Sequence, residues 1–367
     1  MRIDRLVLEN FRCYAAQEIS FDPVCNVISG ENAQGKTNLL EAMVCLATGK
    51  SHRTRSDREL VRFHQEGFQL EGTVFSRGRE FQSHIAYGYG KKKRITVNKV
   101  PAKSASDLSE VLNTVFFCPE DLQLIREGAA ARRRFMDASL CQLRPRYAGA
   151  LAEYQRLYEH KTRILRDSGE RPDLLATLPD FNLRMAETGA VLIHYRARFA
   201  RLLAELAAAA HGECSGGREQ LDIRYRTVKT VEDPFADQGA LAEQLLDHQK
   251  AHSQAELAAR QCLSGPHKDD LEVLLGGLSA RSYASQGQTR TAALAMKLAA
   301  REIHREILGE YPVLLLDDVL SELDPKRQEF VLNRIAGGQV FITCCEDDRL
   351  GRLLNGKIFR VHGGTIE

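Results

Sequence analysis

One short segment near the N-terminus constrains the fold more than any other feature of the chain. It reads Gly30-Glu31-Asn32-Ala33-Gln34-Gly35-Lys36-Thr37 and matches the pattern G-x-x-x-x-G-K-[ST]. The short, mostly apolar segment Val27-Ile28-Ser29 precedes it, and residues 37–47 carry apolar side chains at helical spacing. A strand, a glycine-rich loop and a helix in this order predict a phosphate-binding loop in an α/β protein. Its backbone N–H groups and the helix N-terminus would point at phosphate oxygens.

A second segment, close to the other end of the chain, supplies the acidic residues that such a site needs. Residues 314–316 are all leucine, and Asp317 and Asp318 follow them. This pattern predicts a buried parallel strand that places carboxylates at the carboxyl edge of the sheet. Taken alone, the acid pair could also cap a helix.

Together the two segments predict a site for ATP and Mg²⁺. We expect Lys36 to reach the β- and γ-phosphates, and the Thr37 hydroxyl and Asp317 to bind Mg²⁺. Asp318 would face the attacking water, so both aspartates are candidate catalytic residues. Backbone groups of the whole loop, residues 30–37, are candidate nucleotide contacts.

Two weaker motifs flank the acidic strand. Ser285-Gln286-Gly287-Gln288 precedes it and Ser321-Glu322-Leu323-Asp324 follows it. In this order they resemble the signature motif and the D-loop of ABC-type ATPases. The resemblance makes Ser285, Gly287, Gln288 and Asp324 candidate nucleotide contacts. Because an ABC signature motif contacts the γ-phosphate of ATP held by another subunit, we expect each copy to supply two half-sites.

Hydrophobic periodicity predicts how the rest of the chain is organised. Strand patterns dominate the first hundred residues and return at 221–225, 271–275, 313–316 and 340–343. Helical spacing runs through 146–166 and again from 183 to about 210, with proline and glycine between the two runs. We therefore predict an α/β, ABC-type P-loop head formed by residues 1–119 and 261–367. An inserted helical lobe at 120–260 would carry a short antiparallel helical hairpin.

Composition favours a cytoplasmic protein. No apolar run approaches the roughly 18 residues that a membrane span needs, and the N-terminus lacks the layout of a signal peptide. The nine cysteines are scattered without a C-x-x-C pair, which is typical of reduced cytosolic proteins. The net charge of +2 does not exclude nucleic acid, because local basic patches matter more than the sum.

Several segments, taken together and in order, resemble the RecF family of bacterial recombination-repair ATPases, which are related to SMC heads. The similarity extends from residue 1 to about 345, with Lys268 and Thr289 in place of the family's arginine and glutamine. The matching segments are Glu9–Tyr14 (N-F-R-x-Y), Lys50–Thr54 (K-S-H-R-T), Pro119–Ile125, Arg132–Asp137, Gly265–Leu271 (G-P-H-R-D-D-L), Ser285–Arg290 (S-Q-G-Q-Q-R) and Leu314–Lys326 (L-L-L-D-D-V-x-S-E-L-D).

This resemblance implies an ATP-dependent homodimer that binds gapped DNA or single-strand/double-strand junctions without base preference. It also implies action with RecO and RecR to place RecA on gapped DNA, and support of the SOS response. Arg12 is then a candidate phosphate contact, with a surface or capping role as the alternative. Arg53, Arg55 and the run Lys91-Lys92-Lys93-Arg94 are candidate DNA contacts, although each cluster could also be an ordinary solvated face.

Two alternatives to this reading remain open at the level of sequence. One is the ATPase subunit of a membrane transporter, which would need a switch histidine where Thr343-Cys344-Cys345 stands. The other is a DNA clamp that binds ATP without hydrolysing it. Asp318 replaces the glutamate of transporters and is one methylene shorter, so we expect a weak, slow, DNA-stimulated ATPase that acts as a switch.

Overall fold

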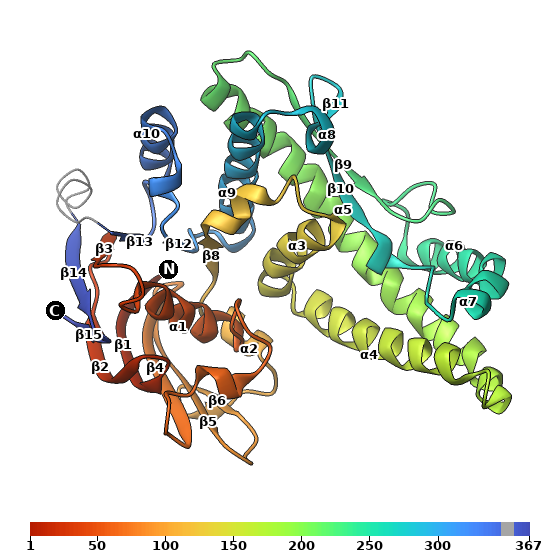
Figure 1. Cartoon of the computed structure of the whole chain (residues 1–367), viewed down its shortest axis with the longest axis horizontal. Helices are drawn as coiled ribbons and strands as arrows, with labels where there is room; N and C mark the ends of the chain where they lie inside the picture. The colour runs from red at the N-terminus through yellow and green to blue at the C-terminus, as the bar shows by residue number, and fades with distance from the viewer. Residues whose placement is uncertain (346–355) are drawn as a thin grey trace. The chain divides into compact units, whose positions relative to one another are not determined.

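The computed structural model describes residues 1–345 and 356–367 (Figure 1). The chain divides into two compact units. One comprises Met1–Gln123 with Lys297–Glu367, and the other comprises Leu124–Met296. We call the first the head unit and the second the helical unit, and describe each by itself.

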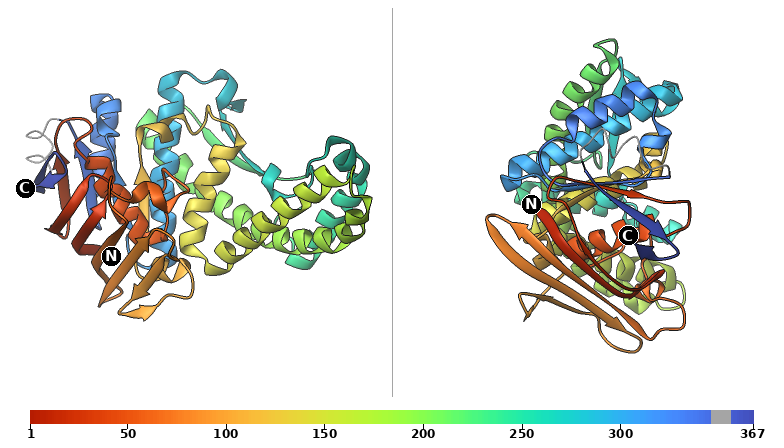
Figure 2. Two further views of the ribbon diagram at one scale, coloured as in Figure 1. Left: turned by 60° about the horizontal axis from the view of Figure 1, so that its bottom comes forward. Right: turned by 90° about the vertical axis from the view of Figure 1, so that its left-hand side faces the viewer.

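An antiparallel sheet forms one layer of the head unit (Figure 2). Its six strands lie in the order β2-β1-β4-β5-β6-β7. They are β1 (Arg2–Phe11), β2 (Tyr14–Ser20), β4 (Gly67–Ser76), β5 (Arg79–Gly88), β6 (Arg94–Val97) and β7 (Val100–Pro101). Along β4, buried and more exposed residues alternate, as expected of a sheet with one covered face. Strands β5 and β6 form a hairpin, with Ile85 opposite Ile95.

A second, mostly parallel sheet forms another layer of the head unit. Its order is β15-β14-β3-β13-β12-β8, and only β15 runs antiparallel to its neighbour. The strands are β3 (Cys25–Ser29), β8 (Thr114–Phe117), β12 (Val313–Leu316), β13 (Val340–Cys344), β14 (Lys357–His362) and β15 (Thr365–Ile366). Every residue of β12 and β13 is buried, which confirms the prediction of parallel strands covered on both faces.

Helix α1 (Lys36–Thr48) packs into the core that the two sheets share. The core cluster joins Leu39 and Leu46 of this helix to Leu70 of the first sheet and Phe341 of the second. A Cβ atom at Gly72 in β4 would lie 2.6 Å from Leu46 Cδ1, so glycine is what lets the helix approach this strand. The short helices of the head unit are η1 (Asp57–Leu60), α2 (Ser106–Ser109), η2 (Pro119–Gln123), η5 (Leu320–Glu322) and α10 (Pro325–Arg334).

The helical unit is built around two long helices, α4 (Pro145–Asp167) and α5 (Leu178–Ser215), joined through η3 (Pro172–Thr177). They form the predicted helical hairpin (Figure 1). The other elements are α3 (Ala129–Leu143), β9 (Leu221–Arg226), α6 (Gln238–Ala251), α7 (Ser253–Ala259), η4 (Pro266–Lys268), β10 (Asp270–Leu275), β11 (Leu278–Ser279) and α8 (Ala280–Tyr283). Helix α9 (Gln286–Leu308) begins in this unit and continues into the head unit.

The second boundary of the helical unit falls at Met296 rather than at the expected residue 260. Strands β9 and β10 pair with each other, with Val273 opposite Ile223, instead of joining the parallel sheet. The buried Arg196 of α5 holds this segment by donating to Asp269 Oδ2 at 2.9 Å and to the Pro266 carbonyl at 2.7 Å. The strands at 221–226 and 270–275 therefore belong to the inserted lobe.

A search of the helices in the described part of the chain finds none with the length and hydropathy of a membrane span.

Candidate nucleotide-binding site

The loop between β3 and α1 has a conformation that requires the two glycines of the motif. Gly30 has φ +151° and Gly35 has φ +123°, a region that favours glycine. A Cβ atom at Gly30 would lie 2.4 Å from the Val361 carbonyl oxygen. One at Gly35 would lie 2.7 Å from Cys13 Sγ. Any side chain at either position would therefore displace the loop from its neighbours.

The Lys36 side chain lies across this loop and is 4% exposed. Its Nζ donates to the carbonyl oxygens of Gly30 at 2.7 Å and Glu31 at 3.1 Å. The loop thus holds at its centre the ammonium group that would bind the β- and γ-phosphates.

Three oxygen-bearing side chains meet beside the first turn of α1. Thr37 Oγ1 donates to Asp317 Oδ1 at 3.0 Å, and Thr343 Oγ1 donates to the same oxygen at 2.9 Å. Burial raises the pKa of Asp317, while the hydrogen bonds from Thr343 and Thr37 oppose that rise. Hydroxyl and carboxylate oxygens are the ligands that Mg²⁺ prefers, so Thr37 and Asp317 fit the predicted metal site.

Asp318 presents a carboxylate oxygen that lacks a protein partner. Its Oδ1 is buried and has no hydrogen bond within the described part of the chain. Its backbone N–H donates to Thr343 Oγ1 at 2.8 Å, and its φ of +50° is strained for a residue with a side chain. A buried polar atom without a partner costs about 1–3 kcal/mol, so this oxygen suits a site where a water molecule or ligand is to be oriented.

Glu41, which sequence reasoning missed, organises the arginines near the loop. Its side chain is fully buried on α1. Arg12 binds it through Nε and Nη2, each at 2.8 Å, and Ser51 Oγ donates to it at 2.5 Å. Arg53 Nη1 lies 3.5 Å from it and also donates to Asn38 Oδ1 at 3.0 Å.

Glu41 therefore fixes both arginines beside the N-terminal turns of α1. Burial opposes ionisation, but hydrogen bonds from Arg12 and Ser51 and the charges of both arginines hold the pKa of Glu41 below its ordinary value. The signal for this residue in the sequence was a lone carboxylate within the apolar run 39–47.

The C-terminal strands support the loop from another side. Gln34 accepts hydrogen bonds from the turn between β14 and β15, at its Oε1 from Gly363 N (2.7 Å) and at its carbonyl from Gly364 N (3.3 Å). Cys345 Sγ donates to Asn32 Oδ1 at 3.0 Å and lies 3.7 Å from Lys36 Nζ. No motif pointed to these contacts, because they depend on how distant strands pair.

The signature candidate lies in the helical unit, where Ser285 and Gln288 form a capping box at the start of α9. Gln288 N donates to Ser285 Oγ at 3.2 Å, and Ser285 N donates to Gln288 Oε1 at 2.6 Å. Gln288 Nε2 also binds Glu219 Oε1 at 2.8 Å, and Gly287 follows in the first helical turn. Ser285 is exposed at a helix N-terminus, a position that favours anions.

Asp324, the D-loop candidate, serves as a helix cap. Its side chain accepts from Arg327 N at 3.1 Å at the start of α10, and it forms an ion pair with the Arg327 guanidinium. The structure thus gives this carboxylate a local role that the sequence motif did not indicate.

Comparison with known proteins agrees with the geometry. The family model described as the RecF/RecN/SMC N-terminal domain matches residues 2–362. The DNA replication and repair protein RecF of Agathobacter rectalis is 39% identical over 369 residues, which cover 100% of this chain and 99% of that protein. The chain belongs to the RecF family.

The fold of this RecF-family chain is similar to that of solved structures. A structure of the recombination mediator protein RecF with ATPrS in the RecFOR pathway matches with a TM-score of 0.93 and 33% identity, covering 100% of this chain and 97% of the other. The Smc head domain of Pyrococcus furiosus, bound to the C-terminal domain of ScpA, matches with a TM-score of 0.55 at 15% identity, covering 100% and 95%. The second likeness concerns the fold alone. The expected ABC-type, SMC-like α/β head is confirmed.

Some candidate DNA contacts of this RecF-family chain are already bound to other protein groups, and others are exposed. Lys93 Nζ donates to Asp57 Oδ1 at 2.7 Å and to the Gly49 carbonyl at 2.8 Å, which fastens the β5–β6 turn to the end of α1. Arg53 is held by Glu41 and Asn38. The exposed residues that stay available for DNA are Arg55, Lys91, Lys92 and Arg94.

Proposed function

We propose that this RecF-family chain is an ATP-dependent DNA-binding protein of recombinational DNA repair and replication-gap repair. The observation that carries the proposal is the Thr37–Asp317 pair, 3.0 Å apart at the end of a phosphate-binding loop. The solved RecF structures that it resembles carry ATP and ATPrS. We therefore assign ATP and Mg²⁺ to this site.

In this proposal the chain's own residues hold and orient the nucleotide. Lys36 binds the β- and γ-phosphates, and the loop N–H groups bind the phosphate oxygens. Thr37 and Asp317 hold the Mg²⁺, which neutralises charge on the phosphates when bound. Thr343 positions Asp317 and the backbone of Asp318, whose unpartnered oxygen orients the attacking water. A short carboxylate at this position suits a slow ATPase.

Assembly and partners follow from the same family membership. Ser285, Gly287 and Gln288 of one copy complete the ATP site of a second, so ATP closes a homodimer. Arg55, Lys91, Lys92 and Arg94 contact DNA phosphates, which carry no base code. We assign to the protein a role with RecO and RecR in placing RecA on gapped DNA, in the cytoplasm and in support of the SOS response. The transporter alternative loses its support, because the chain belongs to a repair family.

The variant Lys36→Met tests the nucleotide site. We expect it to remove most ATP affinity and all DNA-stimulated hydrolysis while the fold is kept, because methionine keeps an unbranched side chain of similar length without the ammonium group. Calorimetry with ATP and thermal unfolding without it measure the two effects. ATP binding at wild-type affinity by this variant would contradict the proposal. A wild-type protein that binds ATP and never hydrolyses it would instead favour the clamp alternative.

A further inference from the structure

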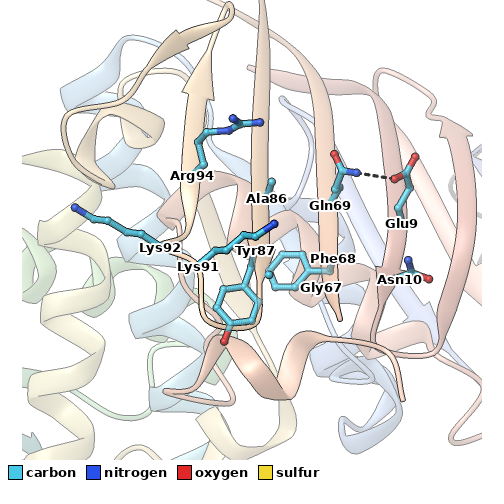
Figure 3. A pocket seen from close by; sticks show the side chains of 11 residues that line it. Glu9, Asn10, Gly67, Phe68, Gln69, Ala86, Tyr87, Lys91, Lys92 and Arg94 are labelled. Atoms are coloured by element: carbon cyan, nitrogen blue, oxygen red, sulfur yellow. Dashed lines mark hydrogen bonds between the residues drawn. The ribbon is translucent and has the colours of Figure 1, made fainter. Parts of the chain in front are cut away.

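A pocket of about 430 Å³ opens on the antiparallel sheet of the head unit (Figure 3). None of its residues belongs to the nucleotide site described above. It is lined by Glu9, Asn10, Gly67, Phe68, Gln69, Ala86, Tyr87, Gly88, Lys91, Lys92 and Arg94.

Strand register explains why the sheet is hollow here. Glu9 lies opposite Gln69, Gln69 opposite Ala86, and Ala86 opposite Arg94, which makes one row across four strands. Neighbouring strands are about 4.7–4.9 Å apart, and the small Ala86 in the middle of the row leaves room between longer side chains. Gly67, at the start of β4, lies opposite Gly88, at the end of β5, so neither strand places a side chain at this end of the pocket.

The pocket carries opposite charges at its two ends. Lys91 extends across β5 toward the pocket, whereas Lys92 points away from it (Figure 3). The side chains of Lys91 and Arg94 are exposed, and neither makes a hydrogen bond or an ion pair within residues 1–345 and 356–367, although the Lys91 backbone N–H donates to the Gly88 carbonyl at 3.0 Å. These two side chains are therefore unneutralised cations at one end.

A carboxylate stands at the other end of the row. Gln69 Nε2 donates to Glu9 Oε2 at 3.0 Å, and His84 Nε2 lies 3.1 Å from Gln69 Oε1. This chain of contacts fixes the orientation of the Gln69 amide. It also leaves Glu9 Oε1 available to accept a hydrogen bond from a ligand.

We propose that this pocket holds one unpaired nucleotide of single-stranded DNA, with its phosphate at Lys91 and Arg94 and its base edge at Glu9. The inference rests on the proposed DNA-binding function and adds a site for an unstacked base. Cations bind phosphate, and a carboxylate accepts from the exocyclic amino group of a base such as cytosine. Thymine lacks this amino group, and its only edge donor, the ring N3–H, lies between two carbonyl oxygens that a carboxylate repels, so the pocket favours a dC nucleotide over a dT nucleotide.

A nucleotide suits the lining better than a peptide does. Peptide-binding sites use apolar pockets for anchoring side chains. Here Phe68 is buried and stacked against Tyr87, with ring centroids 5.8 Å apart, and Ala86 and two glycines form much of the remainder. The charged and amide side chains at the two ends of the pocket then distinguish one ligand from another.

The test uses the full chain with Mg²⁺ and ATP and three fluorescent DNAs: a blunt duplex and the same duplex with a short dC or dT tail. Fluorescence anisotropy gives the dissociation constants. Wild type should bind the dC tail about fivefold to tenfold more tightly than the dT tail, the effect expected of one base contact. Arg94→Ala and Lys91→Ala should abolish the gain that either tail gives over the blunt duplex. Lys92→Ala, the matched control, should keep that gain and weaken all three DNAs alike.

Glu9→Gln distinguishes a base contact from simple charge repulsion. It should weaken binding of the dC tail and leave the dT tail unchanged or slightly tighter. Equal tightening of both tails would overturn the inference, because Glu9 would then only repel phosphate. A preference for the dC tail that survives in Arg94→Ala and Lys91→Ala would also overturn the inference. The same holds if these variants bind both tails normally but no longer bind a protein partner, because the pocket would then be a protein-binding site. Wild-type protein that binds none of the three DNAs would refute the proposed function itself.

Discussion

Asp317 is the residue on which the chemistry of the nucleotide site depends most. Its carboxylate is 6% exposed and accepts two hydroxyl hydrogen bonds at one oxygen. A buried carboxylate is costly when charged, and a metal ion offsets that cost. In the proposed site, Asp317 would therefore destabilise the nucleotide-free protein and bind Mg²⁺ when nucleotide is present.

The isosteric variant Asp317→Asn should separate these two effects. We expect the Tm of the nucleotide-free protein to stay the same or rise, because the amide oxygen still accepts from Thr37 and Thr343 without a buried charge. ATP at a concentration 100-fold above its Kd should stabilise the wild-type protein by about 2.7 kcal/mol in total. In the variant, the part of this stabilisation that depends on Mg²⁺ should be lost. Thermal unfolding without nucleotide, and with ATP in the presence and absence of Mg²⁺, measures the two effects. The variant Asp173→Asn, at an exposed position, is the control. Full Mg²⁺ dependence in Asp317→Asn would rule out this residue as the metal ligand.

Single residues also show where prediction from sequence succeeds and where it stops. The roles of Lys36, Thr37 and Asp317 toward ATP and Mg²⁺ remain predictions, but their places in the loop and at the end of the acidic strand were predictable, because motif and strand pattern are local. Glu41 and Thr343 were not, since their importance comes from contacts with segments far away in the chain. Lys93 shows the opposite case, because a basic run in the sequence does not reveal that one member is fastened to Asp57.

Among the elements, the start of α9 has a structural role and, in the proposed dimer, a functional one. The Ser285–Gln288 capping box stabilises the helix, and the exposed N-terminus favours an anion. The apolar pattern predicted α4, α5 and the core strands, because each helix has one apolar face and the core strands are buried along their whole length. It could not predict that β9 and β10 pair with each other, since strand patterns carry no information about which strand is the partner.

Ser285→Asp should keep the cap and prevent the dimer. Aspartate caps a helix about as well as serine, so the stability of the nucleotide-free protein should be unchanged. Its charge would oppose the γ-phosphate held by the second copy. Sedimentation with Mg²⁺ and ATP should find a dimer for wild type and a monomer for the variant, while calorimetry still finds ATP bound. Ser282→Asp, an exposed neighbour, is the control. A dimer that persists in Ser285→Asp would refute the role of the signature serine.

At the scale of the whole molecule, the two ends of the chain build one nucleotide site. The motifs predicted that Thr37 and Asp317 meet, because the strands before them had to share one sheet despite the inserted lobe, and the two side chains are 3.0 Å apart. The extent of that lobe was harder to predict, since its last strands resemble those of the head. ATP-dependent closure of two copies remains a prediction, and it makes the strength of DNA binding depend on nucleotide.

The most direct test of this account is a salt titration of gapped-DNA binding with Mg²⁺ and ATP and without nucleotide. Closure would present the basic residues of two heads together. We therefore predict tighter binding with ATP and a steeper fall in log Kobs with log salt, by about 0.9 for each additional phosphate neutralised. The same affinity and the same slope in both conditions would contradict the ATP-driven switch.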